Sequence, residues 1–192
     1  MVKAMDLCAL NDGRVVTIRP IRPDDLERLQ LSHARLSEET RYRRFMSAKP
    51  NLSVADAHYL VDIDGTDHYA LVATAPGPDG EVIVGVARYI RLPDRAGTAE
   101  FAIVVGDAWQ GHGLAHELMG RLADAAVTRG VERFCATILP HNLAIQRVIE
   151  SLAAGPVQRR RDSTVFEVEF PLPTRRHDAA PPPAMIAAWA GS

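Results

Sequence analysis

The sequence predicts an α/β fold of the mixed α+β type, in which helices flank a mostly antiparallel sheet. Three observations lead to this fold class. Segments with helical spacing of apolar residues come early, before most of the β-branched runs. Turn signals rich in glycine and proline then separate short extended runs, which indicates an antiparallel meander. Finally, an apolar strand, a glycine-containing turn, an amphipathic helix and another strand follow one another directly.

Length and composition bound the possible functions. A chain of 192 residues that is 47% hydrophobic fits one domain with a core and a tail. A net charge of -2 gives no general attraction to nucleic acid or to a membrane surface, and no apolar run is long enough for a transmembrane helix. Two cysteines make no disulfide framework, and the start of the chain lacks a signal peptide. We therefore expect a cytoplasmic protein without nucleic-acid or membrane partners.

The first half of the chain contains one strand and three helices by this interpretation. Residues 1–13 are expected to be an N-terminal extension, and Val15 to Ile18 form a β-branched first strand between Gly13 and Pro20. Helix-start signals follow at Pro23-Asp24-Asp25, Ser37-Glu38-Glu39 and Ser53-x-x-Asp56. The apolar residues expected on these helices are Leu26, Leu29 and Leu36, then Tyr42, Phe45 and Met46, then Tyr59 and Leu60.

The remaining elements complete a body over residues 14–170. Expected strands are Tyr69 to Thr74 and Val82 to Ile90, joined as a hairpin, then Ala99 to Val105, Arg133 to Leu139 and Thr164 to Phe170. Expected helices are Leu114 to Thr128, ended by Gly130, and Leu143 to Leu152. Because a full helix separates them, the strands at Ala99 and Arg133 should be parallel. Residues 171–192, rich in proline and alanine, read as a flexible tail in which Met185 to Trp189 could dock.

The loop between Val105 and Leu114 has the chemistry of a phosphate site. Gly111 and Gly113 free the backbone, so N–H groups can converge at the helix N-terminus, where the dipole favours negative charge. The loop matches neither G-x-G-x-x-G nor the mononucleotide P-loop. Its spacing, Gln110-x-x-Gly113-x-Ala115, predicts a phosphate or pyrophosphate ligand, with an ordinary glycine-rich turn as the alternative.

That spacing resembles the Q/R-x-x-G-x-G/A loop of the GNAT acyltransferases, which holds coenzyme A, and the order of elements over residues 14–170 is similar to the GNAT fold. Arg19 to Asp25, Leu36 to Phe45 and Ala99 to Val105 look like the GNAT domain of bacterial Pat-type protein lysine acetyltransferases. The resemblance implies a mostly antiparallel mixed sheet of about six or seven strands with a parallel pair at the cofactor site. Pat-type enzymes often carry an extra domain, for which this chain has no room.

Glu100 is the candidate general base. It is the only ionisable residue in the strand Ala99 to Val105, and alternation places it on one face with Ala102 and Val104. The pattern alone also allows a solvated charge at a strand start. The resemblance implies the catalytic role, because the glutamate of the matching A-E-x-A motif serves there as the base.

The resemblance also implies a set of acetyl-CoA contacts. A bulge in the strand would free backbone N–H groups toward the acyl carbonyl, and Asn142 would contact the pantetheine arm, although Asn142 could simply cap the following helix. The implied contacts are the main chain of Ile103, Val104 and Val105, the pyrophosphate loop Gln110, Gly111, His112, Gly113, Leu114 and Ala115, and Asn142.

Other candidate residues carry weaker signals. Many GNAT enzymes have a tyrosine acid seven residues after the asparagine, but Ile149 stands there, so the acid is unassigned. His112 and His116 lack the glutamate of H-E-x-x-H, and we expect no metal. Cys135 reads as a small buried hydrophobe and Trp109 as a packing residue. The arginines of the second helix are either a solvated face or a guide for an acidic acceptor or the adenosine 3′-phosphate: Arg41, Arg43 and Arg44.

The expected function is an acetyl-CoA-dependent N-acetyltransferase that transfers the acetyl group directly to an amine. The preferred acceptor, on resemblance alone, is a protein lysine, for example in an AMP-forming acyl-CoA synthetase. Two alternatives remain open. A small amine or antibiotic would be favoured by a cleft lined with acidic side chains, and a non-catalytic acyl-CoA sensor would not depend on Glu100.

Overall fold

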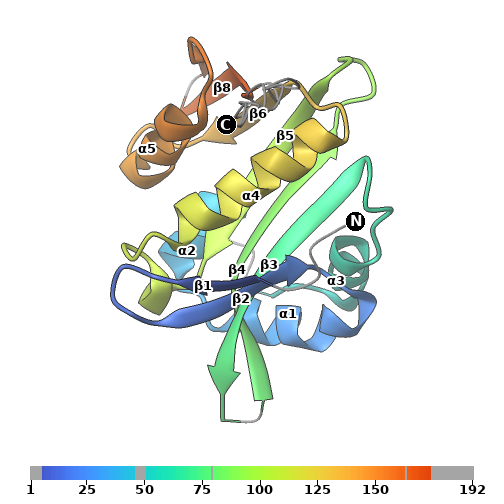
Figure 1. Cartoon of the computed structure of the whole chain (residues 1–192), viewed down its shortest axis with the longest axis vertical. Helices are drawn as coiled ribbons and strands as arrows, with labels where there is room; N and C mark the ends of the chain where they lie inside the picture. Colours follow the sequence, from blue (N-terminus) through green and yellow to red (C-terminus); the bar gives the residue numbers. More distant parts are fainter. Residues whose placement is uncertain (1–5, 46–50, 79, 163, 174–192) are drawn as a thin grey trace, which may run out of the picture.

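The strands of this protein form one sheet that runs through the whole domain. The computed structural model describes residues 6–45, 51–78, 80–162 and 164–173. Its eight strands lie in the order β1-β2-β3-β4-β5-β6-β8-β7, and all neighbours are antiparallel except the parallel pair β5 and β6 (Figure 1). The strands are β1 (Asp6–Ala9), β2 (Val15–Pro20), β3 (His68–Gly77), β4 (Gly80–Arg91), β5 (Thr98–Val105), β6 (Arg133–Ile138), β7 (Gln158–Asp162) and β8 (Val165–Pro171).

Helices cover both faces of the sheet. One apolar cluster joins the sheet to α4 and α5, and a second joins it to α1 and α3. Figure 1 shows α4 lying diagonally across its face of the sheet, with α5 beside β6. The helices are α1 (Leu26–Ala34), α2 (Glu38–Phe45), α3 (Val54–Val61), α4 (Leu114–Thr128) and α5 (Leu143–Leu152), with short 3-10 turns η1 (Pro23–Asp25) and η2 (Asp107–Trp109).

Helix α4 packs closely against strand β4, because the helix has an apolar face and the strand has a glycine opposite it. Leu118, Met119 and Leu122 recur at helical spacing and are fully buried, and burying each such side chain contributes about 1.5–3 kcal/mol. The sheet opposite offers Gly85, where a Cβ atom would lie only 2.9 Å from the Leu118 side chain. A glycine at this position therefore lets the helix approach the strands at the point where β5 delivers the chain to the loop.

On the other face of the sheet, a buried ion pair links strand β2 to the start of helix α1. Arg19 of β2 donates to both carboxylate oxygens of Asp25 at 2.6 and 2.7 Å, and Asp25 also accepts from the Arg22 backbone N–H at 2.9 Å. Burial opposes ionisation of Asp25, but the hydrogen bonds from Arg19 and Arg22 hold its pKa below the ordinary value. The motif Arg19 to Asp25 thus joins the sheet to the start of α1.

The elements around the glycine loop have the expected positions. Helices α4 and α5 have the predicted bounds, and β3 and β4 form the predicted hairpin. The parallel pairing of β5 with β6 is confirmed. Ser53 caps α3 by accepting from the Asp56 backbone N–H, as its sequence signal predicted.

The structure adds details to the expected fold and contradicts one expectation, the burial of Tyr59. The sheet has eight strands because β1 lies inside the segment expected as an extension and β7 lies in the basic run around Arg160. Every residue of β7 is exposed, so the strand lacks the alternation of apolar and polar residues from which a strand is predicted. Tyr59 was expected to be buried but is 61% exposed, because α3 turns Ala57 and Val61 inward instead. Leu172, expected in the tail, is buried.

Two further expectations cannot be compared with the structure, since Met46 and the segment Met185 to Trp189 lie outside the described residues. In the part of the chain that the structure describes, no helix has the length and hydropathy that a membrane crossing needs.

Candidate functional site

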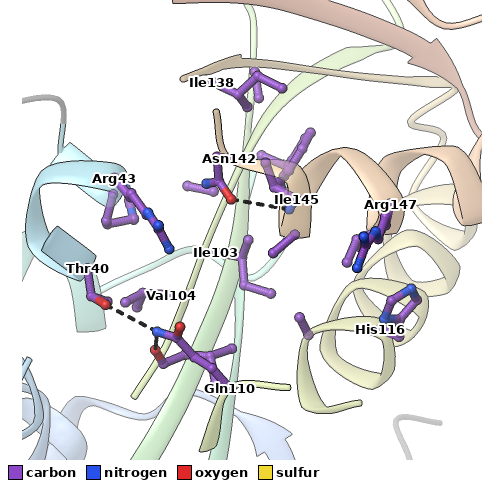
Figure 2. A pocket seen from close by; sticks show the side chains of 18 of the residues that line it. Thr40, Arg43, Ile103, Val104, Gln110, His116, Ile138, Asn142, Ile145 and Arg147 are labelled. Atoms are coloured by element: carbon purple, nitrogen blue, oxygen red, sulfur yellow. Dashed lines mark hydrogen bonds between the residues drawn. The ribbon is translucent and has the colours of Figure 1, made fainter. Parts of the chain in front are cut away.

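The separation of β5 from β6 opens the main cavity of the described structure. The two strands pair only over Thr98–Glu100 and Arg133–Cys135, although β5 continues to Val105 and β6 to Ile138. A cavity of about 740 Å³ lies where the strands diverge, lined by both strands, the glycine loop, α2, α4 and α5. Figure 2 shows Ile103 in its middle, with α2 on one side and α4 and α5 on the other.

The backbone of β5 presents alternate peptide groups to this cavity. Hydrogen bonds from Gly106 N–H to Val84 O (2.9 Å) and from Leu92 N–H to Thr98 O (3.0 Å) set the phase of the antiparallel ladder with β4. Alternation then directs the backbone of Val104 toward β4 and that of Ile103 and Val105 toward the gap left by β6. Main-chain groups can therefore face a ligand at Ile103 and Val105, while Val104 contributes its side chain.

The bulge that the family resemblance implied is not found on the β4 side of β5. The register with β4 runs one to one from Ala99 opposite Arg91 to Val105 opposite Gly85. The irregularity lies one strand away, between β3 and β4, after Ala73. The divergence of β6, rather than an extra residue in this register, frees the backbone of β5.

The glycine loop has the conformation of an anion site at a helix start. Gly111 and Gly113 have φ values of +80° and +90°, a region that disfavours other residues, and Gly113 caps α4. A Cβ atom on Gly113 would lie 3.2 Å from the Asn11 side chain, so the β1–β2 turn also restricts this position. The first N–H groups of α4 lack helical partners and carry the positive end of the dipole.

Not every predicted loop residue reaches the cavity. Gln110, Gly111, Gly113 and Ala115 line it. The His112 side chain does not, because its Nδ1 lies 3.1 Å from an Asp12 carboxylate oxygen, and Leu114 is 1% exposed in the core.

A hydrogen-bond network that the sequence did not reveal ties the loop to α2. Asp107 accepts from the Ser37 hydroxyl at 2.6 Å, the Ser37 N–H at 2.9 Å and the Thr40 hydroxyl at 2.6 Å. Burial opposes the shift, but these bonds hold the pKa of Asp107 below its ordinary value. The Gln110 amide in turn donates to Thr40 Oγ1 at 3.1 Å and to Val105 O at 3.0 Å (Figure 2). The Gln110 side chain thus braces the end of β5 against α2.

Glu100 lies at the far end of β5 from the loop. It is exposed, lines the cavity, and shares a face with Ala102 and Val104, as alternation predicted. Arg44 of α2 lies close enough to interact with it: burial lowers the pKa of Arg44, and the negative charge of Glu100 opposes that shift. Arg43 also lines the cavity, whereas Arg41 is not among its lining residues.

The wall formed by α5 contains Asn142. Its Oδ1 accepts from the Ile145 N–H at 3.3 Å, which caps α5, and the residue also lines the cavity (Figure 2). Both sequence interpretations of Asn142 are therefore compatible with its position. Ile149, at the position of the family's tyrosine, is 1% exposed and belongs to the core.

The remaining candidates are Cys135, His116 and Trp109. Burial raises the pKa of Cys135 to about 11, which disfavours the reactive thiolate. His116 lines the cavity beside Arg147, and Trp109 packs against the core with the Arg14 guanidinium 4.2 Å from its ring centroid. Among the described residues, no group of three or more His, Cys, Asp or Glu side chains could hold a metal ion.

Comparison with known proteins assigns the family. The model of the acetyltransferase (GNAT) domain matches residues 16–154. The chain is 37% identical over 162 residues to acetyltransferase Pat of Mycolicibacterium smegmatis, covering 83% of this chain and 47% of that protein, so it spans about half of that relative's length. It is also 37% identical over 157 residues to acetyltransferase PA5475 of Pseudomonas aeruginosa, covering 81% of this chain and 83% of that protein.

A solved structure agrees with these relatives. The GNAT domain of S. lividans PAT superposes with a TM-score of 0.77 at 34% identity, covering 88% of this chain and 97% of that one. The parallel pair, the glycine loop at the start of α4 and the cavity between β5 and β6 occur within the matched region. The chain belongs to the GNAT acetyltransferase family.

Proposed function

We propose that this chain is an acetyl-CoA-dependent N-acetyltransferase that modifies a protein lysine, with Glu100 as the general base. One observation carries the proposal. A single cavity, opened by the divergence of β5 and β6, has a carboxylate toward one end of β5 and a glycine loop at a helix N-terminus toward the other. A long ligand with a diphosphate at one end and a thioester at the other suits this arrangement.

The diphosphate end has its donors in the backbone. The positive φ values of Gly111 and Gly113 allow N–H groups of the loop and the first turn of α4 to point toward one place, where the helix dipole favours an anion. The Gln110 amide is engaged with Thr40 and Val105, so its role is to hold the loop, and the phosphate contacts fall to the main chain.

The thioester end has groups suited to acyl transfer. Backbone N–H groups of Ile103 and Val105 face the gap beside β5 and can donate to the acyl carbonyl as negative charge develops on its oxygen. The amine nitrogen forms the new bond to the carbonyl carbon, the carbon–sulfur bond breaks, and the thiolate leaves.

Glu100 can remove the proton from the acceptor amine, whose positive charge is the largest barrier to its attack on the thioester. With a lysine pKa near 10.4, about one side chain in a few thousand is neutral at pH 7, equivalent to about 4.6 kcal/mol of barrier. A carboxylate next to the amine, directly or through water, can take the proton as the new bond forms. Glu100 is exposed in the cavity, where an incoming amine can reach it.

The charge of the cavity favours a protein lysine over a polycationic small molecule. The described lining residues include three arginines (Arg43, Arg44 and Arg147) and one carboxylate, Glu100. A polyamine or an aminoglycoside would bring several positive charges into a cleft that is already basic, whereas a single lysine brings one. An AMP-forming acyl-CoA synthetase is the protein acceptor that the Pat resemblance favours.

The variant Glu100→Gln tests the proposed mechanism. We expect turnover with acetyl-CoA and a purified AMP-forming acyl-CoA synthetase to fall by roughly 10²- to 10⁴-fold, because the amide cannot accept the proton. The affinity for acetyl-CoA, measured by calorimetry, should change little. Glu27→Gln, at an exposed position of α1, is the matched control. Turnover that survives Glu100→Gln would remove Glu100 from catalysis.

A further inference from the structure

The turn between β1 and β2 lies against the glycine loop. The sequence assigns residues 1–13 to an N-terminal extension, and the match to the GNAT domain model begins only at residue 16. In the structure, the Asn11 N–H donates to His112 O at 3.1 Å, and the Arg14 guanidinium donates to Ala108 O at 3.0 Å. A segment that precedes the matched region is therefore bonded to the main chain of the loop.

Side chains reinforce this contact between the turn and the loop. The Arg14 guanidinium lies 4.2 Å from the centroid of the Trp109 ring, which is a favourable position for a cation. Asp12 accepts from Arg14 Nε at 2.6 Å, and its carboxylate lies 3.1 Å from His112 Nδ1. Contacts with Ala108, Trp109 and His112 thus hold the turn beside the start of α4.

The Asn11 side chain extends from this turn to the cavity, which it lines while staying exposed. Its amide approaches within 3.2 Å of the position that a Cβ atom on Gly113 would occupy, so the glycine leaves the space in which the amide lies. Among the described residues, no hydrogen bond engages this amide, and its NH2 group offers N–H donors. The amide is therefore a donor beside the helix N-terminus that the described protein groups do not use.

The diphosphate of acetyl-CoA leaves room for a donor from outside the loop. A diphosphate has acceptor oxygens on both of its phosphate groups, whereas the backbone N–H groups at one helix N-terminus converge on a single place. The Gln110 amide is already engaged with Thr40 and Val105, and the His112 side chain does not line the cavity. The Asn11 amide, beside the helix start, can supply a further donor.

We propose that Asn11 is a further residue of the donor site, whose side-chain amide donates a hydrogen bond to the diphosphate of acetyl-CoA. The inference rests on the proposed function and adds a residue that determines donor specificity. A hydrogen bond from a neutral amide to a charged phosphate oxygen is stronger than one between neutral groups, so Asn11 favours thioesters that carry the diphosphate. The β1–β2 turn, held by its contacts with the loop, positions this amide.

Two variants of Asn11 test the contact through the affinity for acetyl-CoA, measured by calorimetry. Asn11→Ala should weaken binding by about 5- to 30-fold, because a hydrogen bond to a charged group is lost. Asn11→Asp keeps the size of the side chain and the backbone bond to His112, but a negative oxygen replaces the NH2 group, so binding should weaken further and recover partly in added salt. Asn51→Ala, at an exposed position outside the cavity lining, is the matched control, with thermal unfolding recorded for each variant.

Truncated donors distinguish a contact with the diphosphate from an effect on the shape of the site. The loss in Asn11→Ala should be equal for acetyl-CoA and for dephospho-acetyl-CoA, which keeps the diphosphate, and absent for S-acetylpantetheine, which has no phosphate. An equal loss with S-acetylpantetheine, or full affinity for acetyl-CoA in Asn11→Asp, would overturn the inference and leave the proposed function standing. A loss confined to acetyl-CoA would overturn it by moving the contact to the 3′-phosphate. A wild-type chain that does not bind acetyl-CoA would instead reject the proposed function.

Discussion

At the scale of single residues, most side chains of the loop before α4 are engaged with the protein itself. Gln110 braces β5 and α2 through its amide, His112 turns to Asp12, and Leu114 enters the core. What remains for a ligand is backbone, and the backbone depends on Gly113 with its φ of +90°. The family pattern therefore describes a loop shape more than a set of contacting side chains.

Replacing Gly113 by valine should abolish acetyl-CoA binding. A β-branched residue at positive φ costs about 1–3 kcal/mol, and its Cβ would meet the Asn11 side chain at 3.2 Å. We expect the loop to rearrange and the affinity measured by calorimetry to fall by at least about 100-fold. Gly120→Val is the control, since a Cβ at Gly120 of α4 meets open space. Retained affinity in Gly113→Val would separate the loop from the cofactor site.

At the scale of elements, α2 is joined to the cofactor loop by Asp107. Three hydrogen bonds from Ser37 and Thr40 end on this carboxylate, and the same helix carries Arg43 and Arg44, which line the cavity. The helix is short and polar, so it has little burial of its own to hold it in place. Contact with the loop thus positions the helix that presents these arginines to the cavity.

The variant Asp107→Ala should loosen α2 without unfolding the sheet. Loss of the carboxylate removes two exposed hydrogen bonds from Ser37 and one part-buried hydrogen bond from Thr40, and a hydrogen bond to a charged group contributes about 1.5–3 kcal/mol. We expect amide hydrogen exchange in α2 to accelerate by roughly 10- to 100-fold while exchange in α4 stays as it is. Asp94→Ala, in the exposed loop before β5, should leave both unchanged. Equal protection of α2 in the two variants would contradict the coupling.

At the scale of the whole molecule, the cavity forms because the parallel strands β5 and β6 diverge after pairing over three residues. Neighbouring strands in this sheet otherwise run antiparallel. The gap admits a ligand between β5 and β6, α4 brings its N-terminus to one end, and α2 brings arginines to the other. In the proposed reaction, donor and acceptor would therefore meet inside the domain.

Local patterns explain which of these features the sequence could predict. The bounds of α4 and α5 followed from apolar periodicity and the signals at Gly113, Gly130 and Asn142, and the parallel pair followed from the helix between its strands. Strand β7 escaped prediction because all its residues are exposed. The contact of Ser37 with Asp107 spans 70 residues, and no local pattern encodes it. Arg43 lines the cavity and Arg41 does not, and this difference depends on which face α2 turns toward the cavity, which the sequence alone does not give.

One measurement tests the central claim most directly. The purified chain is incubated with acetyl-CoA and, separately, with an AMP-forming acyl-CoA synthetase, spermidine and an aminoglycoside, while thiol release and the mass of each acceptor are followed. The account predicts the added mass of one acetyl group on a lysine of the protein acceptor, with matching thiol release. Acetylation of only spermidine or the aminoglycoside would contradict the protein-lysine acceptor. Binding of acetyl-CoA without modification of any acceptor would contradict catalysis and favour an acyl-CoA sensor.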